Sequence, residues 1–152
     1  MMCHLQRCLA ALLFACYAPF GVSADLQLVV SGISGVTGKI YITVFNSAES
    51  FETMDSASHD FYALLALPAN DYSVSAVLEQ LPDGDYCVVV FHDENANDEL
   101  DSNLFGFPSE ALGFSNNTPL KDAPTFLSTR FSVSGSARVT KTIQLIYPNR
   151  GK

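Results

Sequence analysis

Apolar and polar side chains alternate at every second position along several short segments of this 152-residue chain. The alternation is clear in residues 26–31 and 72–78. Residues 39–45 and 86–91 are instead nearly continuous runs of β-branched and aromatic residues. A period of two is typical of a strand with one buried face, and an unbroken apolar run indicates a strand buried on both faces. The chain is therefore expected to fold mainly as β-strands, without a long helix.

Seven segments carry this strand signal: 26–31, 39–45, 61–67, 72–78, 85–92, 126–134 and 139–147. Turn residues separate them. In Leu81-Pro82-Asp83-Gly84, the proline presets φ and the glycine is expected to take a positive φ. Residues 93–124 break the pattern and read as one long loop, with 46–60 as a packed loop or short helical turn. The sequence thus predicts an all-β fold, an antiparallel Greek-key-type β-sandwich of about seven strands with one long acidic loop.

The first 24 residues have the features of an export signal. Arg7 is their only formal charge, residues 9–15 form a short apolar core, and Val22-Ser23-Ala24 offers small side chains to a signal peptidase. We expect cleavage between Ala24 and Asp25, which leaves residues 25–152 as one soluble domain in the periplasm or outside the cell. No later apolar run is long enough to cross a bilayer.

A second processing route stays open at this stage. Leu13-Phe14-Ala15-Cys16 also fits a lipoprotein signal, in which Cys16 would carry a lipid anchor. Either route leaves Cys87 inside the domain without an internal disulfide partner. Cys87 lies in an apolar run, so a buried and inert thiol is expected.

The charge balance limits the kinds of molecule that the protein is expected to bind. The chain has 16 acidic residues against eight Lys and Arg, and a formal net charge of −8. All 16 acidic residues follow residue 24, so loss of Arg7 with the signal would make the net charge −9. An acidic domain without a cluster of Lys or Arg is expected to avoid nucleic acid and anionic lipid surfaces.

The acidic loop carries the strongest candidate site. Oxygen-bearing side chains recur at every second position, in Asp93, Asn95, Asn97, Glu99 and Asp101. Such spacing lets ligands in a tight loop turn towards one hard cation, with Glu99 contributing its carbonyl oxygen. Leu104 stands where an EF-hand would place its bidentate Glu, so Asn103 or Glu110 would supply a further oxygen. The sequence predicts a weak structural Ca²⁺ site, and the alternatives are a solvated acidic loop without metal and a transition-metal site.

Catalytic residues are harder to find. His92, Asp93 and Glu110 would form a small hydrolase site if they converged on one cleft. His92 is more simply interpreted as a framework residue that orients the loop. Ser115 lies outside any Gly-x-Ser-x-Gly elbow, and residues 113–117 fit ordinary turn chemistry. The interpretation we favour is therefore a protein without catalytic activity.

Three motifs, taken in order, resemble one family of exported bacterial proteins, the domain of unknown function family 2141. They are residues 81–86 (Leu-Pro-Asp-Gly-Asp-Tyr), residues 92–101, and residues 106–116, which include Gly-Phe-Pro and Gly-Phe-Ser-Asn. The resemblance implies an exported β-sandwich similar to transthyretin-like and carboxypeptidase-regulatory domains, with no established activity. This chain departs from the family pattern at Ala96 and Asp98, where Gly is usual, and the departure would weaken the sharp turn that a calcium loop needs.

The sequence leaves two further roles open beside the calcium-binding module. One is the hydrolase that uses His92, Asp93 and Glu110. The other is a transthyretin-like ligand-binding or adhesion module without metal, which would use a sheet face or edge. Its partner would be a protein or a small molecule that the sequence does not identify.

Overall fold

A computed structural model describes residues 23–54, 61–119 and 123–148. The expected signal segment lies almost wholly outside these residues, as does Cys16. Ser23 and Ala24 are the first residues of strand β1 and pair with Pro82 and Leu81. Cleavage after Ala24 stays a prediction, and it would shorten β1 by two residues.

Eight strands, two short α-helices and one 3₁₀ helix make up the described part of the chain. In chain order they are β1 (Ser23–Ser31), β2 (Lys39–Phe45), α1 (Ala48–Glu52), β3 (Ala63–Pro68), β4 (Ser73–Pro82), β5 (Gly84–Asp93), β6 (Ala111–Phe114), η1 (Ser115–Asn117), α2 (Phe126–Thr129), β7 (Phe131–Val133) and β8 (Val139–Gln144). None of the described helices is long and apolar enough to span a membrane.

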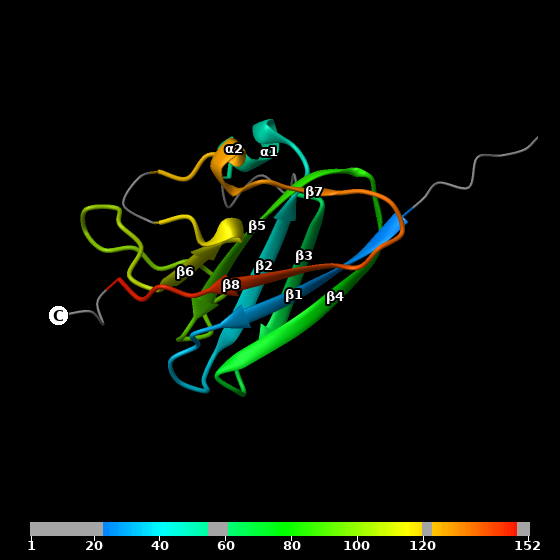
Figure 1. The fold of residues 1–152 in the computed structure, drawn as a ribbon. Coiled ribbons are helices and arrows are strands. Elements are labelled where there is room, and N and C mark those ends of the chain that lie inside the picture. Colours follow the sequence, from blue (N-terminus) through cyan, green and yellow to red (C-terminus); the bar gives the residue numbers. More distant parts are fainter. Residues whose placement is uncertain (1–22, 55–60, 120–122, 149–152) are drawn as a thin grey trace, which may run out of the picture.

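The strands form two packed sheets, which confirms the predicted β-sandwich (Figure 1). One sheet has the order β4-β1-β8. The other has the order β3-β2-β5-β6, with β7 pairing the start of β5. Inward side chains at every second position, such as Leu26, Leu28 and Val30, are fully buried between the sheets. The two-residue period of the sequence thus marks the core face.

One pair of strands departs from the antiparallel prediction. β1 and β8 run parallel, in a register that sets Leu26 opposite Val139 and Ser31 opposite Gln144. Parallel neighbours need a long connection, and here nearly the whole domain lies between the two strands. Periodicity reports which face is buried but not the direction of the neighbouring strand, so the sequence could not reveal this pair.

Two predicted boundaries are wrong. Residues 126–134 do not form one strand, because Thr125 and Ser128 make a reciprocal capping box that begins helix α2, and only Phe131–Val133 is extended. The predicted loop 93–124 contains strand β6, which pairs with β5. A Cβ on Gly113 would lie 2.8 Å from Cγ2 of Ile143, so glycine lets β6 approach β8 closely.

The turn at residues 81–84 also differs from its prediction. It is a corner at which the chain leaves the β1 sheet in β4 and enters the β2 sheet in β5. The left-handed residue is Gln80, with φ 59°, whereas Gly84 has no positive φ. The Tyr86 hydroxyl donates to the Pro82 carbonyl at 2.9 Å and braces the corner.

The apolar run of β5 is buried on both faces, as predicted. Its inward side chains Val88 and Val90 lie in the main core, whereas Cys87 and Val89 belong to a second cluster on the outer face of the sheet. Phe51 of α1 lies in this second cluster, and Phe126 of α2 packs against it. Burial raises the pKa of the Cys87 thiol to about 12, which agrees with an inert, buried cysteine.

Among the described glycines, Gly38 lies closest to another backbone segment. A Cβ at this position would lie 1.9 Å from the Asp93 carbonyl oxygen, and its φ of +77° disfavours any other residue.

We expect Gly38→Ala to lower the free energy of unfolding by roughly 3 kcal/mol or more, because backbone strain and overpacking would add. Gly35→Ala is the matched control, because Gly35 has φ +100° but open space around its Cβ. It should lose only the cost of the left-handed backbone, about 1–2 kcal/mol. Urea unfolding of both variants would measure the difference, and equal losses would contradict the close approach.

Candidate functional site

Asp93 closes the acidic loop at the end of β5. Its side chain is fully buried, and its two carboxylate oxygens accept the backbone N–H groups of Asn97 at 3.1 Å and Asp98 at 3.0 Å. The loop bends sharply enough to make these bonds because Ala96 and Asp98 both adopt left-handed backbone, with φ 59° and 67°. The family pattern has glycine at these two positions, and here the turn forms with Ala96 and Asp98 in its place.

Glu110 ties the two ends of the loop together. One of its carboxylate oxygens accepts the N–H of Glu94 at 2.9 Å, and the other accepts the N–H of Asp101 at 3.1 Å. The pairing of β6 with β5 sets Ala111 opposite His92 and so delivers Glu110 to this position. Of the two extra residues that the sequence offered, Glu110 joins the loop.

Asn103 does not join it. Its side-chain oxygen accepts the N–H groups of Phe105 and Phe107, further along the chain. It is therefore committed to a separate turn.

Asp101 faces the amides of the two predicted asparagines. Its carboxylate accepts Nδ2–H from Asn95 at 2.8 Å and from Asn97 at 3.0 Å. The amide oxygens of these residues accept the backbone N–H groups of Asn97 and Glu99 in two successive side-chain turns. The five predicted ligand residues therefore lie on one compact loop, and the positive ends of two amide dipoles stand next to the Asp101 carboxylate.

The charges of the loop are only partly balanced by side chains. Lys39 of β2 forms an ion pair with the exposed Asp98, and Tyr41 donates to the same carboxylate. The hydrogen bond from Lys39, followed by that from Tyr41, holds the pKa of Asp98 below its usual range. Neither Asp93 nor Glu110 takes part in an ion pair anywhere in residues 23–54, 61–119 and 123–148, although both are buried.

The His, Cys, Asp and Glu side chains of the described residues do not form a metal-binding cluster. Over the described residues, no three His, Cys, Asp or Glu side chains gather as a group that could hold a metal ion. Any cation here would depend on asparagine and backbone oxygens in addition to the carboxylates. Such mixed oxygen sets suit Ca²⁺ better than zinc or another transition metal.

His92 is a framework residue in this structure. It is fully buried, and its Nε2 lies 2.7 Å from the Thr37 carbonyl oxygen, so Nε2 carries the proton and donates. Nδ1 then accepts from the Tyr147 hydroxyl at 2.7 Å, while that hydroxyl accepts the N–H of Ser34. Both ring nitrogens are used in holding β5, the β1–β2 loop and the C-terminal segment together. The arrangement leaves no nitrogen of His92 facing a cleft with Asp93 and Glu110.

Ser115 and Asn116 also serve the fold. The Ser115 hydroxyl accepts the N–H of Val88 at 3.0 Å and donates to the Thr129 carbonyl at 2.6 Å. Asn116, with φ 62°, donates to the carbonyls of Thr129 and Arg130. The segment therefore ties β5 to the end of α2, as expected from turn chemistry.

Sequence reasoning missed the residues that support the loop from other elements. Gly38 lies against the backbone of Asp93 and Glu94, Lys39 and Tyr41 bind Asp98, and Tyr147 fixes His92. Gly38 carried a usable signal, since a glycine at a strand commonly marks close approach of another backbone. Tyr147 is 55 residues from His92, and no local pattern joins them.

The fold and the loop together define a β-sandwich domain whose acidic loop is closed by two buried carboxylates. Residues 28–141 match the family model described as "Uncharacterized protein conserved in bacteria (DUF2141)". The chain belongs to this family, and the resemblance seen in its three motifs is confirmed. No curated protein and no solved structure matches the chain, so the likeness to transthyretin stays a prediction.

The left-handed residues of the loop allow a test of its geometry. Ala96 is exposed and its φ is 59°, so Ala96→Gly removes backbone strain without removing a hydrogen bond. We expect it to raise the free energy of unfolding by about 0.5–1 kcal/mol after the greater entropy of the unfolded glycine chain is deducted. Asp98→Gly relieves the same strain but loses the contacts with Lys39 and Tyr41, so its gain should be smaller. Chemical denaturation would compare them, and a loss of stability in Ala96→Gly would argue against the turn.

Ser115 offers a second test, because a structural and a reactive serine predict opposite results. Ser115→Ala leaves a buried N–H of Val88 and a buried carbonyl of Thr129 without this partner. We expect a loss of about 1–3 kcal/mol in the free energy of unfolding. Ser132→Ala, which removes an exposed hydroxyl bonded to Asp85, should cost less than about 1 kcal/mol. Melting curves that showed no difference between these variants would refute the structural role of Ser115.

Proposed function

We propose that the protein is an exported, non-catalytic β-sandwich module whose acidic loop binds one Ca²⁺ weakly. The ion would be structural, and it would fix the loop between β5 and β6 on the end of the sandwich. The residues that would hold it are Asp93, Asn95, Asn97, Asp101 and the backbone carbonyl of Glu99, with Glu110 as the additional carboxylate.

The observation that carries this proposal is the burial of Asp93 and Glu110. Their side chains are 0% and 5% exposed, and no cationic side chain of the described residues pairs with either. Backbone N–H groups satisfy part of their hydrogen-bonding capacity. A carboxylate has about four lone-pair sites, so each could still accept a cation. Buried charge without a counter-charge is unfavourable, and a bound cation would supply that counter-charge.

The donor set fits Ca²⁺ with one adjustment. The two amides now present hydrogens to Asp101. Calcium would require their oxygens instead, and each amide would then give up a hydrogen bond within the loop. The loss of these bonds, together with the absence of glycine at positions 96 and 98, argues for affinity in the weak extracellular range, roughly 10⁻⁴–10⁻³ M.

Two further points support the rest of the proposal. His92, one of the three residues of the hydrolase alternative, uses both ring nitrogens in hydrogen bonds that hold the fold together, and the Ser115 hydroxyl is bonded in the same way. The amino-terminal sequence has the charge, apolar core and small-residue pattern of an export signal. Concentrations of Ca²⁺ that saturate a weak site are found outside the cytoplasm, so the two parts of the proposal agree.

Thermal unfolding tests the calcium site directly. The full chain would be unfolded in EDTA and then with about 5 mM Ca²⁺ or Mg²⁺. At ten times a Kd of ~0.5 mM, binding to the native state adds about 1.4 kcal/mol. The melting temperature should rise by several degrees with Ca²⁺ and much less with Mg²⁺. An unchanged melting temperature in Ca²⁺ would reject the site.

Two substitutions that each remove one negative charge from the loop test which residues bind the ion. Asp101→Asn removes a proposed carboxylate ligand and should abolish the shift that Ca²⁺ induces. Glu99→Gln removes the same charge two residues away, but it leaves the carbonyl oxygen in place and should keep most of the shift. If both variants lose the shift equally, general charge attraction rather than a defined site explains it.

A further inference from the structure

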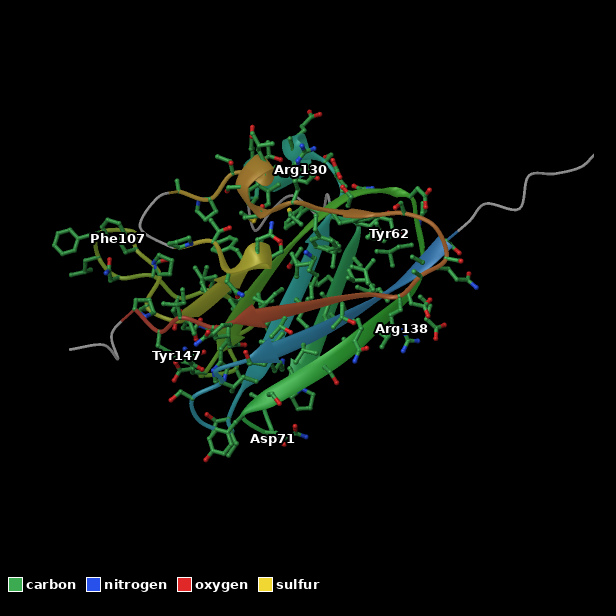
Figure 2. All side chains as sticks on the ribbon, in the orientation of Figure 1. Tyr62, Asp71, Phe107, Arg130, Arg138 and Tyr147 are labelled. Atoms are coloured by element: carbon green, nitrogen blue, oxygen red, sulfur yellow. The ribbon has the colours of Figure 1, made fainter. Side chains whose placement is uncertain are left out.

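An apolar finger projects from the loop between β5 and β6. We define it as residues 102–109, closed at its base by an isolated antiparallel bridge between Ser102 and Pro108. Leu104 is fully exposed, and Phe105 and Phe107 are 84% and 68% exposed. Figure 2 shows Phe107 at the edge of the molecule, pointing away from both sheets. Three large, exposed apolar side chains within four residues of one loop are uncommon on a protein surface and indicate a contact site.

The finger has a fixed shape because most of its backbone N–H groups are bonded within it. The N–H of Asn103 donates to the Phe107 carbonyl at 2.8 Å, and that of Gly106 donates to the Asn103 carbonyl at 2.9 Å. The side-chain oxygen of Asn103 accepts the N–H groups of Phe105 and Phe107. Four of the five N–H groups from 103 to 107 are thus bonded within the finger, and Pro108 has none to offer. Little conformational entropy remains to be lost on binding.

We propose that this finger inserts Leu104, Phe105 and Phe107 into the interfacial layer of a zwitterionic lipid surface. Residues 102–109 contain no charged side chain. Backbone N–H groups that leave bulk water for the edge of an apolar layer lose fewer hydrogen bonds when they are already bonded within the protein. A finger that only filled a pocket in a protein would not need this, since the pocket itself can provide partners.

The negative charge next to the finger favours zwitterionic over anionic lipids. Asp101 immediately precedes the finger and Glu99 lies two residues earlier, the chain carries a net charge of −8, and Lys39, which contacts the same acidic loop, is paired with Asp98. Anionic lipids would be repelled by this base. The outermost group of phosphatidylethanolamine or phosphatidylcholine is an ammonium, which complements carboxylates that stay in the water layer above the inserted side chains. Three side chains give reversible binding rather than permanent anchoring.

The absence of tryptophan from the chain makes a sharp test available. Phe107→Trp places the single tryptophan at the tip of the finger. Tyr72→Trp is the matched control, because Tyr72 is also about 70% exposed but lies on the β3–β4 connection. Both full-length variants would be titrated, in EDTA, with vesicles of phosphatidylethanolamine and phosphatidylcholine. We expect the emission of Phe107→Trp to move to shorter wavelength and to be quenched by brominated acyl chains, while the Tyr72→Trp emission stays unchanged.

Additional variants separate insertion from general adhesion. In the Phe107→Trp background, Phe105→Ser should weaken partition into the vesicles about tenfold or more, whereas Leu127→Ser, an exposed apolar position on α2, should not. Addition of anionic phosphatidylglycerol should reduce the shift in tryptophan emission.

The proposal is overturned if Phe107→Trp emission does not respond to vesicles, if Tyr72→Trp responds equally, or if the response requires anionic lipid. An unresponsive finger would instead be assigned to a protein pocket. The assay contains no Ca²⁺, so its result is independent of the calcium site.

Discussion

Strand β5 is hydrogen-bonded to β2 over residues 87–93, to β6 over residues 89–92 and to β7 over residues 84–86. No other described strand pairs with three partners. Its inward side chains fill the main core and its outward ones fill a second cluster under α1 and α2, so both faces are apolar from Cys87 to Phe91. The last two residues of the strand, His92 and Asp93, are the first polar groups after this run, and both are fully buried. Their burial forces the surrounding elements to supply hydrogen-bond partners, and those partners build the loop end of the molecule.

His92 and Asp93 bind different parts of this end of the molecule. His92 uses both ring nitrogens to connect the β1–β2 loop with the C-terminal segment, which also crosses from β8 to pair Ile146 with Leu112 of β6. Asp93 uses both oxygens to fold the acidic loop on itself, and Glu110 closes that loop from the far side. A network in which every buried polar atom has a partner is rigid, and the described residues contain no buried side-chain nitrogen or oxygen without one. Rigidity at this end explains how a loop rich in Asn and Asp holds a defined shape.

Local pattern predicted the strands that are long and periodic, together with the core face of each. It failed where tertiary contacts decide the structure. β6 is only four residues long and contains Gly113, and it is extended because it lies between β5 and β8. Helix α2 interrupts an apparent strand because the Thr125–Ser128 capping box outweighs the strand propensity of Phe126. In the candidate site, the spacing of Asp93, Asn95, Asn97 and Asp101 was sufficient to bring them onto one loop. The supporting contacts from Lys39, Tyr41 and Tyr147 depend on strand register and could not be read from neighbouring residues.

The direction of β1 separates the two ends of the domain. β1 begins at Ser23 beside the corner formed by β4 and β5, and it runs towards the end that carries the acidic loop and the apolar finger (Figure 1). A nine-residue strand is about 30 Å long. Any tether that reaches the domain through Ser23 therefore attaches at one pole, while the finger faces outward from the other. A protein held to one surface by its amino terminus would present the finger to a second surface, and the domain would act as a spacer of fixed length between them.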